Sequence, residues 1–168
     1  MGEMAYTLAF YFSAALTLVA AIGVISSRNL VHSALLLALT FIGVAGLYVL
    51  LSADFLSAVQ LLVYNGAVAV IIVIGVMLTQ AGDMTNSNPS NKLAGGAAVV
   101  TGGIMALIVG AIMLTPWKIS PVAPPEETAS AIAQILLSDF AIAFEAAAVL
   151  LLVAMIGAII LAKGGDQT

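Results

Sequence analysis

The sequence contains no cysteine and very little charge. Only 7% of its 168 residues are Asp, Glu, Lys or Arg, and it has a single histidine. The absence of cysteine excludes disulfides, thiolate metal sites and cysteine-held iron–sulfur clusters. The net charge is only −4 and the basic residues are scattered, so there is no tract that would bind nucleic acid. No phosphate-binding loop, metal-ligand cluster or nucleophile–base set occurs either. We therefore expect no catalytic residue, no metal site and no bound cofactor on this chain.

Apolar side chains are what the chain has in excess, at 63% of its residues. A soluble protein of this size needs a polar coat, and lipid removes that need. Five long apolar runs predict transmembrane helices at approximately 4–26, 30–51, 55–79, 93–115 and 138–162. Helices satisfy every backbone group within hydrocarbon, and short alternating strands are missing. The expected fold is an all-α integral membrane protein, with a single membrane domain over residues 1–168.

Two polar linkers separate these spans. Residues 80–92 join the third span to the fourth, and residues 116–130, which contain four prolines, join the fourth to the fifth. Residues 131–139 fit either a short interfacial helix or an early turn of the fifth span.

The basic residues predict the orientation of the chain. With five spans, Arg28, Lys92 and Lys163 fall on one side of the membrane and Lys118 on the other. The positive-inside rule then places the N-terminus outside and the C-terminus in the cytoplasm. The N-terminal residues lack the positive region of a signal peptide, so the first span is expected to be retained.

Few polar side chains lie within the spans. Asp54 precedes the third run and is predicted to be an N-cap, where its carboxylate would accept hydrogen bonds from the first amides. Gln60 and Tyr64 are four residues apart and share a helix face with Ser57, which is typical of hydrogen bonding between helices. Glu145 lies in the first turns of the fifth span. It is either an interfacial carboxylate or a protonatable group facing the protein interior.

Small residues recur every four positions in two of the spans. Such faces let helix backbones approach closely in lipid. The repeats consist of Ala98, Gly102, Ala106 and Gly110 in the fourth span, and of Ala154, Ala158 and Ala162 in the fifth. They predict helix-packing surfaces for neighbours in this chain or in other chains.

The stretch LVYNGAVAV, residues 62–70, places Asn65 and Gly66 in the middle of the third span. Glycine loosens a helix, and asparagine competes for backbone hydrogen bonds. A π-bulge, a feature often found at functional positions, would accommodate such a site. Close packing of another helix against Gly66 would explain the glycine equally well.

Two segments carry a resemblance to a known family. DFLSAVQLLVYNGAVAVIIVIGVML (54–78) resembles the third transmembrane helix of the J subunit of NADH–quinone oxidoreductase, a bacterial relative of a small core subunit of mitochondrial complex I. The matching residues are Asp54, Phe55, Ala58, Gln60, Tyr64, Gly66, Ala67, Met77 and Leu78. FEAAAVLLLVAMIGAIILAK (144–163) is similar to the family's last helix. Arg28, Asn29, His32 and Ser33 are similar to its first loop. The sequence departs from the family at Asn65, where apolar or small residues are more common, and at Gly75, where bulk is usual.

The resemblance implies a non-catalytic membrane-arm subunit of a proton-translocating quinone oxidoreductase of the complex I type. Its third helix would carry a π-bulge at Tyr64, Asn65, Gly66 and Ala67. By switching between bulged and regular forms, this helix would make or break a water chain and so couple quinone reduction to proton translocation. Asp54, Gln60 and Glu145 are the candidates for a proton path.

The same resemblance implies partners, cofactors and a location. The partners would be a quinone-site subunit, a K-type small subunit and antiporter-like subunits within the lipid bilayer. Quinone, iron–sulfur clusters and, for some electron donors, FMN would be held by those other subunits. The membrane would be the plasma membrane of a prokaryotic cell or a thylakoid.

Three alternatives remain at the level of the sequence. The first is a small subunit of a multisubunit cation/proton antiporter or membrane-bound hydrogenase. The second is a stand-alone transporter, which internal repeats and broken-helix pairs would favour, and neither is present. The third is a structural scaffold, for which Gly66→Ala would leave coupling unchanged.

Overall fold

The computed structural model describes residues 2–79, 93–117 and 127–164. These residues contain five helical segments long and apolar enough to cross a membrane: α1 (Gly2–Ser26), α2 (Leu30–Leu50), a third span over Asp54–Thr79, α5 (Ala94–Leu114) and α7 (Ala141–Lys163). The third span consists of α3 (Asp54–Val59), a π-helix η1 (Gln60–Val68) and α4 (Ala69–Thr79). The predicted all-α fold with five spans and a π-bulge in the third is confirmed. The predicted linker 80–92 and Lys118 lie outside the described residues.

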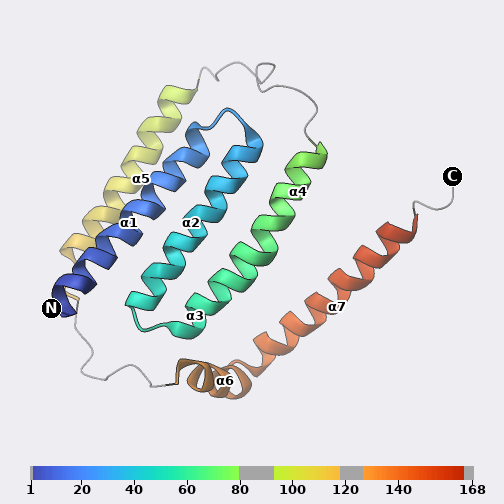
Figure 1. Ribbon diagram of the computed structural model, residues 1–168. Helices are drawn as coiled ribbons and strands as arrows, with labels where there is room; N and C mark the ends of the chain where they lie inside the picture. Colours follow the sequence, from blue (N-terminus) through green and yellow to red (C-terminus); the bar gives the residue numbers. More distant parts are fainter. Residues whose placement is uncertain (1, 80–92, 118–126, 165–168) are drawn as a thin grey trace.

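Three antiparallel spans lie side by side and form the packed part of the molecule (Figure 1). α2 is in the centre, with α1 on one side and the third span on the other. The buried side chains are small or polar and belong to these spans: Ala20, Ala34, Ala45, Ser57, Gln60 and Ala69. Small residues allow close approach of helices where lipid gives no hydrophobic gain.

The contact between α1 and α2 depends on two glycines of α2. A Cβ atom added at Gly43 would collide with the Thr17 hydroxyl and come within 3.1 Å of the Thr17 backbone nitrogen. One added at Gly46 would lie 2.9 Å from the Ser13 Oγ. The Thr17 hydroxyl donates to the backbone carbonyl of Ser13 at 2.8 Å, so this hydroxyl is satisfied within α1. The absence of a Cβ at these glycines therefore sets the distance between α1 and α2.

The two short connections of this layer are held by hydrogen bonds. Asn29 caps α2, and its Oδ1 accepts from the amides of Val31 at 2.9 Å and His32 at 3.3 Å. α2 ends in a Schellman motif, in which the Ala53 amide donates to the Tyr48 carbonyl and Ser52 adopts a φ of 55°. The third span therefore returns alongside α2 after only three residues, 51–53.

α6 (Thr128–Ser138) is a separate short helix, which decides between the two interpretations of residues 131–139. α6 is seen nearly end-on in Figure 1, across the direction of the spans, and it contacts both α3 and α7. Two predicted boundaries were wrong. Residues 128–130 were expected in the linker but are helical, because the last proline is Pro125 and a helix is unhindered beyond it. The fifth span begins at Ala141 rather than at 138, after a turn at residues 139–140.

α5 and α7 stand apart from the three-helix layer. Within the described part of the chain, α7 has close backbone contacts only with α6, and α5 has none with another element. A Cβ added at Gly102 or Gly110 meets no atom within 4 Å. The small-residue face of Ala98, Gly102, Ala106 and Gly110 thus packs on none of the described helices, and its role in packing stays a prediction.

Candidate coupling helix

The π-helix η1 lies in the middle of the third span and contains all four residues predicted for the bulge, Tyr64, Asn65, Gly66 and Ala67. Its last turn is closed by the Ala69 amide, which donates to the Tyr64 carbonyl five residues earlier. An α-helix would use the carbonyl four residues earlier. Each π-turn therefore takes up one residue more than an α-turn.

These wider turns change which residues of the third span face α2. Gln60 is 7% exposed and Ala69 is 2% exposed, and both lie on the α2 side. They are nine residues apart, which is about 2.5 turns of an α-helix at 3.6 residues per turn. A regular α-helix would put them on opposite faces. The π-helix thus allows Gln60, its first residue, and Ala69, the first residue of α4, to face the same neighbour.

Polar and aromatic side chains fill the contact between α2 and the first half of the third span. The Ser57 hydroxyl donates to the Ala45 carbonyl at 3.0 Å. The ring of Tyr64 meets Phe41 edge-on, with centroids 5.8 Å apart. For Ser57, the predicted hydrogen bonding between helices is therefore confirmed. Tyr64 instead packs its aromatic ring against Phe41 of α2.

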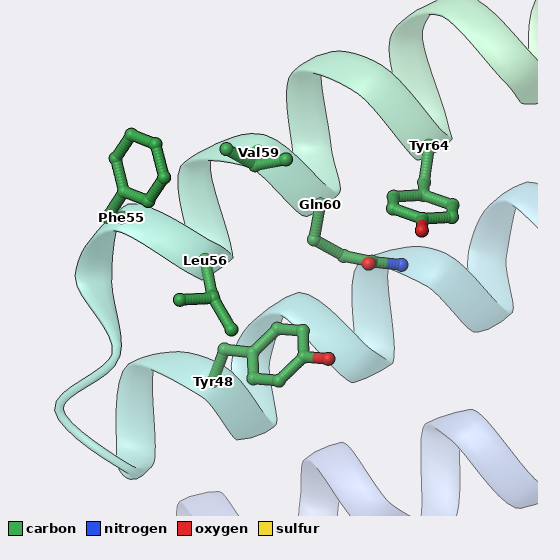
Figure 2. Close-up of a pocket in the computed structure, with 6 residues that line it drawn as sticks. All are labelled: Tyr48, Phe55, Leu56, Val59, Gln60 and Tyr64. Carbon is green, nitrogen blue, oxygen red and sulfur yellow. The ribbon is translucent and has the colours of Figure 1, made fainter. Parts of the chain in front are cut away.

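A pocket of about 260 Å³ lies beside this contact (Figure 2). Gln60 reaches from the third span toward α2, and in this view its carboxamide lies between the rings of Tyr48 and Tyr64. Phe55, Leu56 and Val59 complete the lining. The structure thus brings the predicted residues Gln60 and Tyr64 to one cavity that has polar groups on an apolar wall.

Asn65 and Gly66 have different surroundings, although they are adjacent. The Asn65 Oδ1 is buried, and no atom of the described chain hydrogen-bonds to it. Gly66 is exposed, and a Cβ added there would meet only the Leu61 carbonyl oxygen, at 3.4 Å. No described helix of this chain therefore packs against Gly66. Of the two explanations for this glycine, close packing is not seen among the described helices, whereas the π-helix is present.

The prediction that Asp54 is an N-cap was wrong by one position. Ala53 is the N-cap residue, Asp54 is the first residue of α3, and no side chain of the cap residue bonds there. Instead, the Phe55 amide donates to the Thr128 Oγ1 of α6 at 3.2 Å. A hydroxyl that is distant in sequence thus performs the capping role. The Asp54 carboxylate still lies in the first turn, where the helix dipole favours a negative charge.

The third candidate for a proton path, Glu145, is not brought to the pocket. It is the fifth residue of α7, about 6 Å along the helix at 1.5 Å per residue. α7 does not touch the third span among the described helices, but α6 contacts both. The starts of α3 and α7 therefore lie at the same end of the molecule, and only Gln60 of the three candidates lines the pocket.

Sequence reasoning missed Phe41, Tyr48 and Thr128. Phe41 and Tyr48 are seven residues apart, with Ala45 between them, a spacing that puts all three on one face of α2. That pattern could have identified the partner face of the third span. No local pattern identifies Thr128. Among the described residues, no group of three or more His, Asp or Glu side chains is placed to hold a metal.

A family model and individual related proteins all match this chain to the same family. A family model described as NADH-ubiquinone/plastoquinone oxidoreductase chain 6 matches residues 20–161. The NAD(P)H-quinone oxidoreductase chain 6 of Synechocystis sp. is 41% identical over 165 residues, covering 97% of this chain and 83% of that protein. The protein of the same name from Leptolyngbya boryana is 40% identical and covers 97% and 82%. The chloroplastic subunit 6 of Nephroselmis olivacea is 39% identical and covers 91% and 92%.

These matches extend over nearly the whole chain and so include the third span, the last span and the first loop that carried the resemblance. The expected relationship to the small membrane subunit is confirmed, and the antiporter, hydrogenase and stand-alone transporter alternatives give way to it. The chain belongs to the NADH-ubiquinone/plastoquinone oxidoreductase chain 6 family and is a membrane subunit of an NAD(P)H-quinone oxidoreductase of the complex I type.

Proposed function

We propose that this chain couples quinone reduction to proton translocation through a change in its third span. The observation that carries the proposal is the π-helix over Gln60–Val68, which interrupts a span that is otherwise α-helical. A π-helix is less regular than an α-helix and occurs often at functional positions. When one π-turn converts to an α-turn, that turn contains one residue fewer.

The size of the movement follows from helix geometry. Each residue of an α-helix accounts for a rotation of about 100°, because there are 3.6 residues per turn. If one π-turn of η1 converted to an α-turn, α3 and α4 would therefore rotate relative to each other by about that angle. Gln60, at the start of η1, and Ala69, directly after its end, would then face different neighbours. A packed helix with two discrete arrangements is a suitable coupling element.

The proton path that we propose starts from polar residues that the chain itself provides. Gln60 and Tyr64 line the pocket next to α2, and hydration of this pocket would depend on the form of η1. Asp54 and Glu145 lie at the end of the molecule where α6 joins the third span to α7. In the assembled complex these carboxylates would exchange protons with water chains that neighbouring subunits complete.

Gly66→Leu tests the switch. The added bulk is expected to let the complex assemble but to hinder conversion of η1, and so to lower the number of protons pumped per electron. Proton uptake by vesicles is measured together with quinone reduction. Gly66→Ala is the graded control, since its Cβ meets only the Leu61 carbonyl at an ordinary contact distance of 3.4 Å, and an intermediate loss is expected. Normal pumping in the Leu variant would contradict the proposal and favour a structural scaffold.

We further propose the orientation with the N-terminus outside and the C-terminus in the cytoplasm. Arg28 lies between the end of α1 and the start of α2, and Lys163 is the last residue of α7; these helix ends lie at one end of the spans (Figure 1). The other end holds the starts of α1, α3 and α7 together with α6, and the acidic residues at those places are Glu3, Asp54, Glu127 and Asp139. The basic end is expected on the cytoplasmic side. The membrane would be the plasma membrane of a prokaryotic cell or a thylakoid.

The partners that we propose are a quinone-site subunit, a K-type small subunit and antiporter-like subunits, with quinone, iron–sulfur clusters and any FMN on other chains. A pull-down of the tagged chain in mild detergent, followed by mass spectrometry, tests this set and identifies the electron-input subunit. Antiporter-like partners without any redox subunit would contradict it.

A further inference from the structure

Aromatic residues are distributed unevenly between the two ends of the spans. The chain has six Phe, four Tyr and one Trp. Residues 13–40, 65–116 and 145–168 contain none of them. These stretches include the end of α1, the start of α2, the end of α4, the start of α5 and the end of α7. No aromatic residue of the described helices therefore lies near the end of the spans that holds Arg28.

At the other end, every span has an aromatic residue within five positions of the place where its helix starts or stops (Figure 1). We call these six residues the aromatic belt: Tyr6 of α1, Tyr48 of α2, Phe55 of α3, Trp117 after α5, and Phe140 and Phe144 at the start of α7. Five residues of an α-helix extend over about 7 Å. The aromatic belt therefore lies at a similar level on all five spans.

Two side chains of the aromatic belt hydrogen-bond to the last turns of helices. The Tyr6 hydroxyl donates to the Leu50 carbonyl of α2 at 2.9 Å, and the Trp117 Nε1 donates to the Ile112 carbonyl of α5 at 2.9 Å. The last four carbonyls of a helix have no amide partner within it, and in hydrocarbon such groups need a donor. Both bonds are therefore expected where a helix ends at the edge of the hydrocarbon.

The rings of the aromatic belt are accessible from outside the chain. Tyr6 is 51% exposed and Trp117 is 71% exposed. Phe55, Phe140 and Phe144 are 39%, 56% and 45% exposed. The next question is whether lipid or a protein partner covers them.

The arrangement of the aromatic belt favours lipid. A protein partner would cover one side of the molecule, and its contact residues would lie at several depths along that side. The aromatic belt instead has one depth and extends to α5 and α7, which stand apart from the three-helix layer. A common level on separate helices is typical of the boundary between hydrocarbon and headgroups, where aromatic side chains form belts.

The charges at the same end restrict the kind of headgroup. The acidic residues there are Glu3, Asp54, Glu127 and Asp139, and no described Lys or Arg lies among them. Lys118 is the one base that the sequence predicts on this side. Anionic lipids are attracted by clusters of Lys and Arg. Carboxylates repel a negatively charged headgroup, so this end fits lipids whose headgroups are uncharged or zwitterionic.

We propose that the aromatic belt is a lipid-binding surface, which docks this end of the chain at the headgroup boundary of lipids with neutral headgroups. The described helices carry no second belt at the opposite end. The proposal requires neither the switch in η1 nor a choice of which side of the membrane the aromatic belt faces.

Photo-labelling of the intact complex tests the proposal. The complex is reconstituted in phosphatidylcholine vesicles that contain a phosphatidylcholine with a diazirine next to its ester groups, and adducts on this chain are mapped by mass spectrometry. Labelling is expected to be stronger in the peptides that contain Tyr6, Trp117 and Phe140 than in a peptide covering residues 24–34. Equal labelling of the two ends would overturn the proposal. So would an unlabelled aromatic belt in a complex whose other subunits are labelled, because neighbouring subunits would then cover it.

The same diazirine on a phosphatidylglycerol tests the choice of headgroup. Labelling of the aromatic belt is expected to be about fivefold weaker than with the phosphatidylcholine probe, the effect of about one charge near a membrane surface. Asp139→Asn removes one of the carboxylates and should narrow this difference. Equal or stronger labelling of the unchanged chain by the anionic probe would overturn the selection of neutral headgroups.

Substitutions at Trp117 separate the aromatic ring from its position in the chain. Trp117→Leu is expected to weaken labelling at the end of α5, because leucine favours hydrocarbon whereas Trp and Tyr favour the headgroup boundary. Trp117→Tyr should keep the labelling. Leu114→Ile is the matched control, since Leu114 is 86% exposed at the same helix end and the change keeps an aliphatic side chain. Equal labelling in the Leu and Tyr variants, at equal chain levels in the membrane, would contradict the role of the aromatic ring.

Discussion

Gly43 shows how one residue determines a helix contact. A Cβ at this position would collide with the Thr17 hydroxyl and come within 3.1–3.2 Å of Thr17 backbone atoms, which cannot move without shifting α1. We expect Gly43→Ala to destabilise the packing of α1 on α2 by about 1–3 kcal/mol, the usual effect of overpacking. The measurement is unfolding of the purified chain by SDS in mixed micelles, followed by the helical signal. Gly75→Ala is the matched control, because a Cβ at Gly75 meets nothing within 4 Å. Equal effects of the two substitutions would contradict the close contact.

Ser52 illustrates the opposite case, in which a residue other than glycine occupies a conformation that favours glycine. Its φ of 55° lies in the left-handed region, at the position that ends a Schellman motif. The left-handed conformation costs a residue with a Cβ roughly 1–2 kcal/mol. Ser52→Gly should therefore stabilise the chain by up to about 1 kcal/mol, after allowance for the greater freedom of glycine in the unfolded state. Ser52→Val should destabilise it. SDS unfolding that ranks Val above Gly would refute this account.

At the scale of the helical elements, the third span shows what sequence could and could not predict. The Asn65–Gly66 pair marked the place where the α-helix is interrupted, because both residues weaken regular hydrogen bonding. The extent of η1, from Gln60 to Val68, could not be predicted from this pair. The length of η1 is the one that turns both Gln60 and Ala69 toward α2. This requirement arises from packing against α2 and not from the helix preference of the residues themselves.

The start of α3 shows the same limit more sharply. Asp54 is a good capping residue by type, but the acceptor for the Phe55 amide is Thr128, 73 positions away. Thr128→Val keeps the shape of the side chain and removes its acceptor, so the first turn of α3 should lose about 0.5–2 kcal/mol, as for the loss of an N-cap. Hydrogen exchange of a peptide covering residues 52–59 is expected to be faster in the Val variant. Thr128→Ser, which keeps the hydroxyl, should exchange like the unchanged chain; equally fast exchange in both variants would exclude the hydrogen bond as the cause.

At the scale of the whole molecule, the number of spans could be predicted and their arrangement could not. Apolar runs of about 20 residues are needed to cross a bilayer, so run length alone identifies the five spans. Which helices touch depends on small residues and polar pairs, such as Gly43 with Thr17 and Ser57 with Ala45. The small-residue repeat of α5 was equally visible in the sequence, yet no described helix of this chain packs on it. A repeat of this kind predicts that a surface packs, and it does not identify the partner.

The separation of α7 from the three-helix layer makes Glu145 the residue that best tests the extended proton path. Its carboxylate is exposed within this chain and lies only about 6 Å along α7, so neighbouring subunits decide its environment. We expect Glu145→Gln to lower the number of protons pumped per electron while the complex still assembles, since the amide keeps the shape but cannot release a proton. Glu145→Asp, which keeps the carboxylate, should pump more than the Gln variant. Unchanged pumping in Glu145→Gln would instead make Glu145 an interfacial carboxylate and would restrict the path on this chain to the third span.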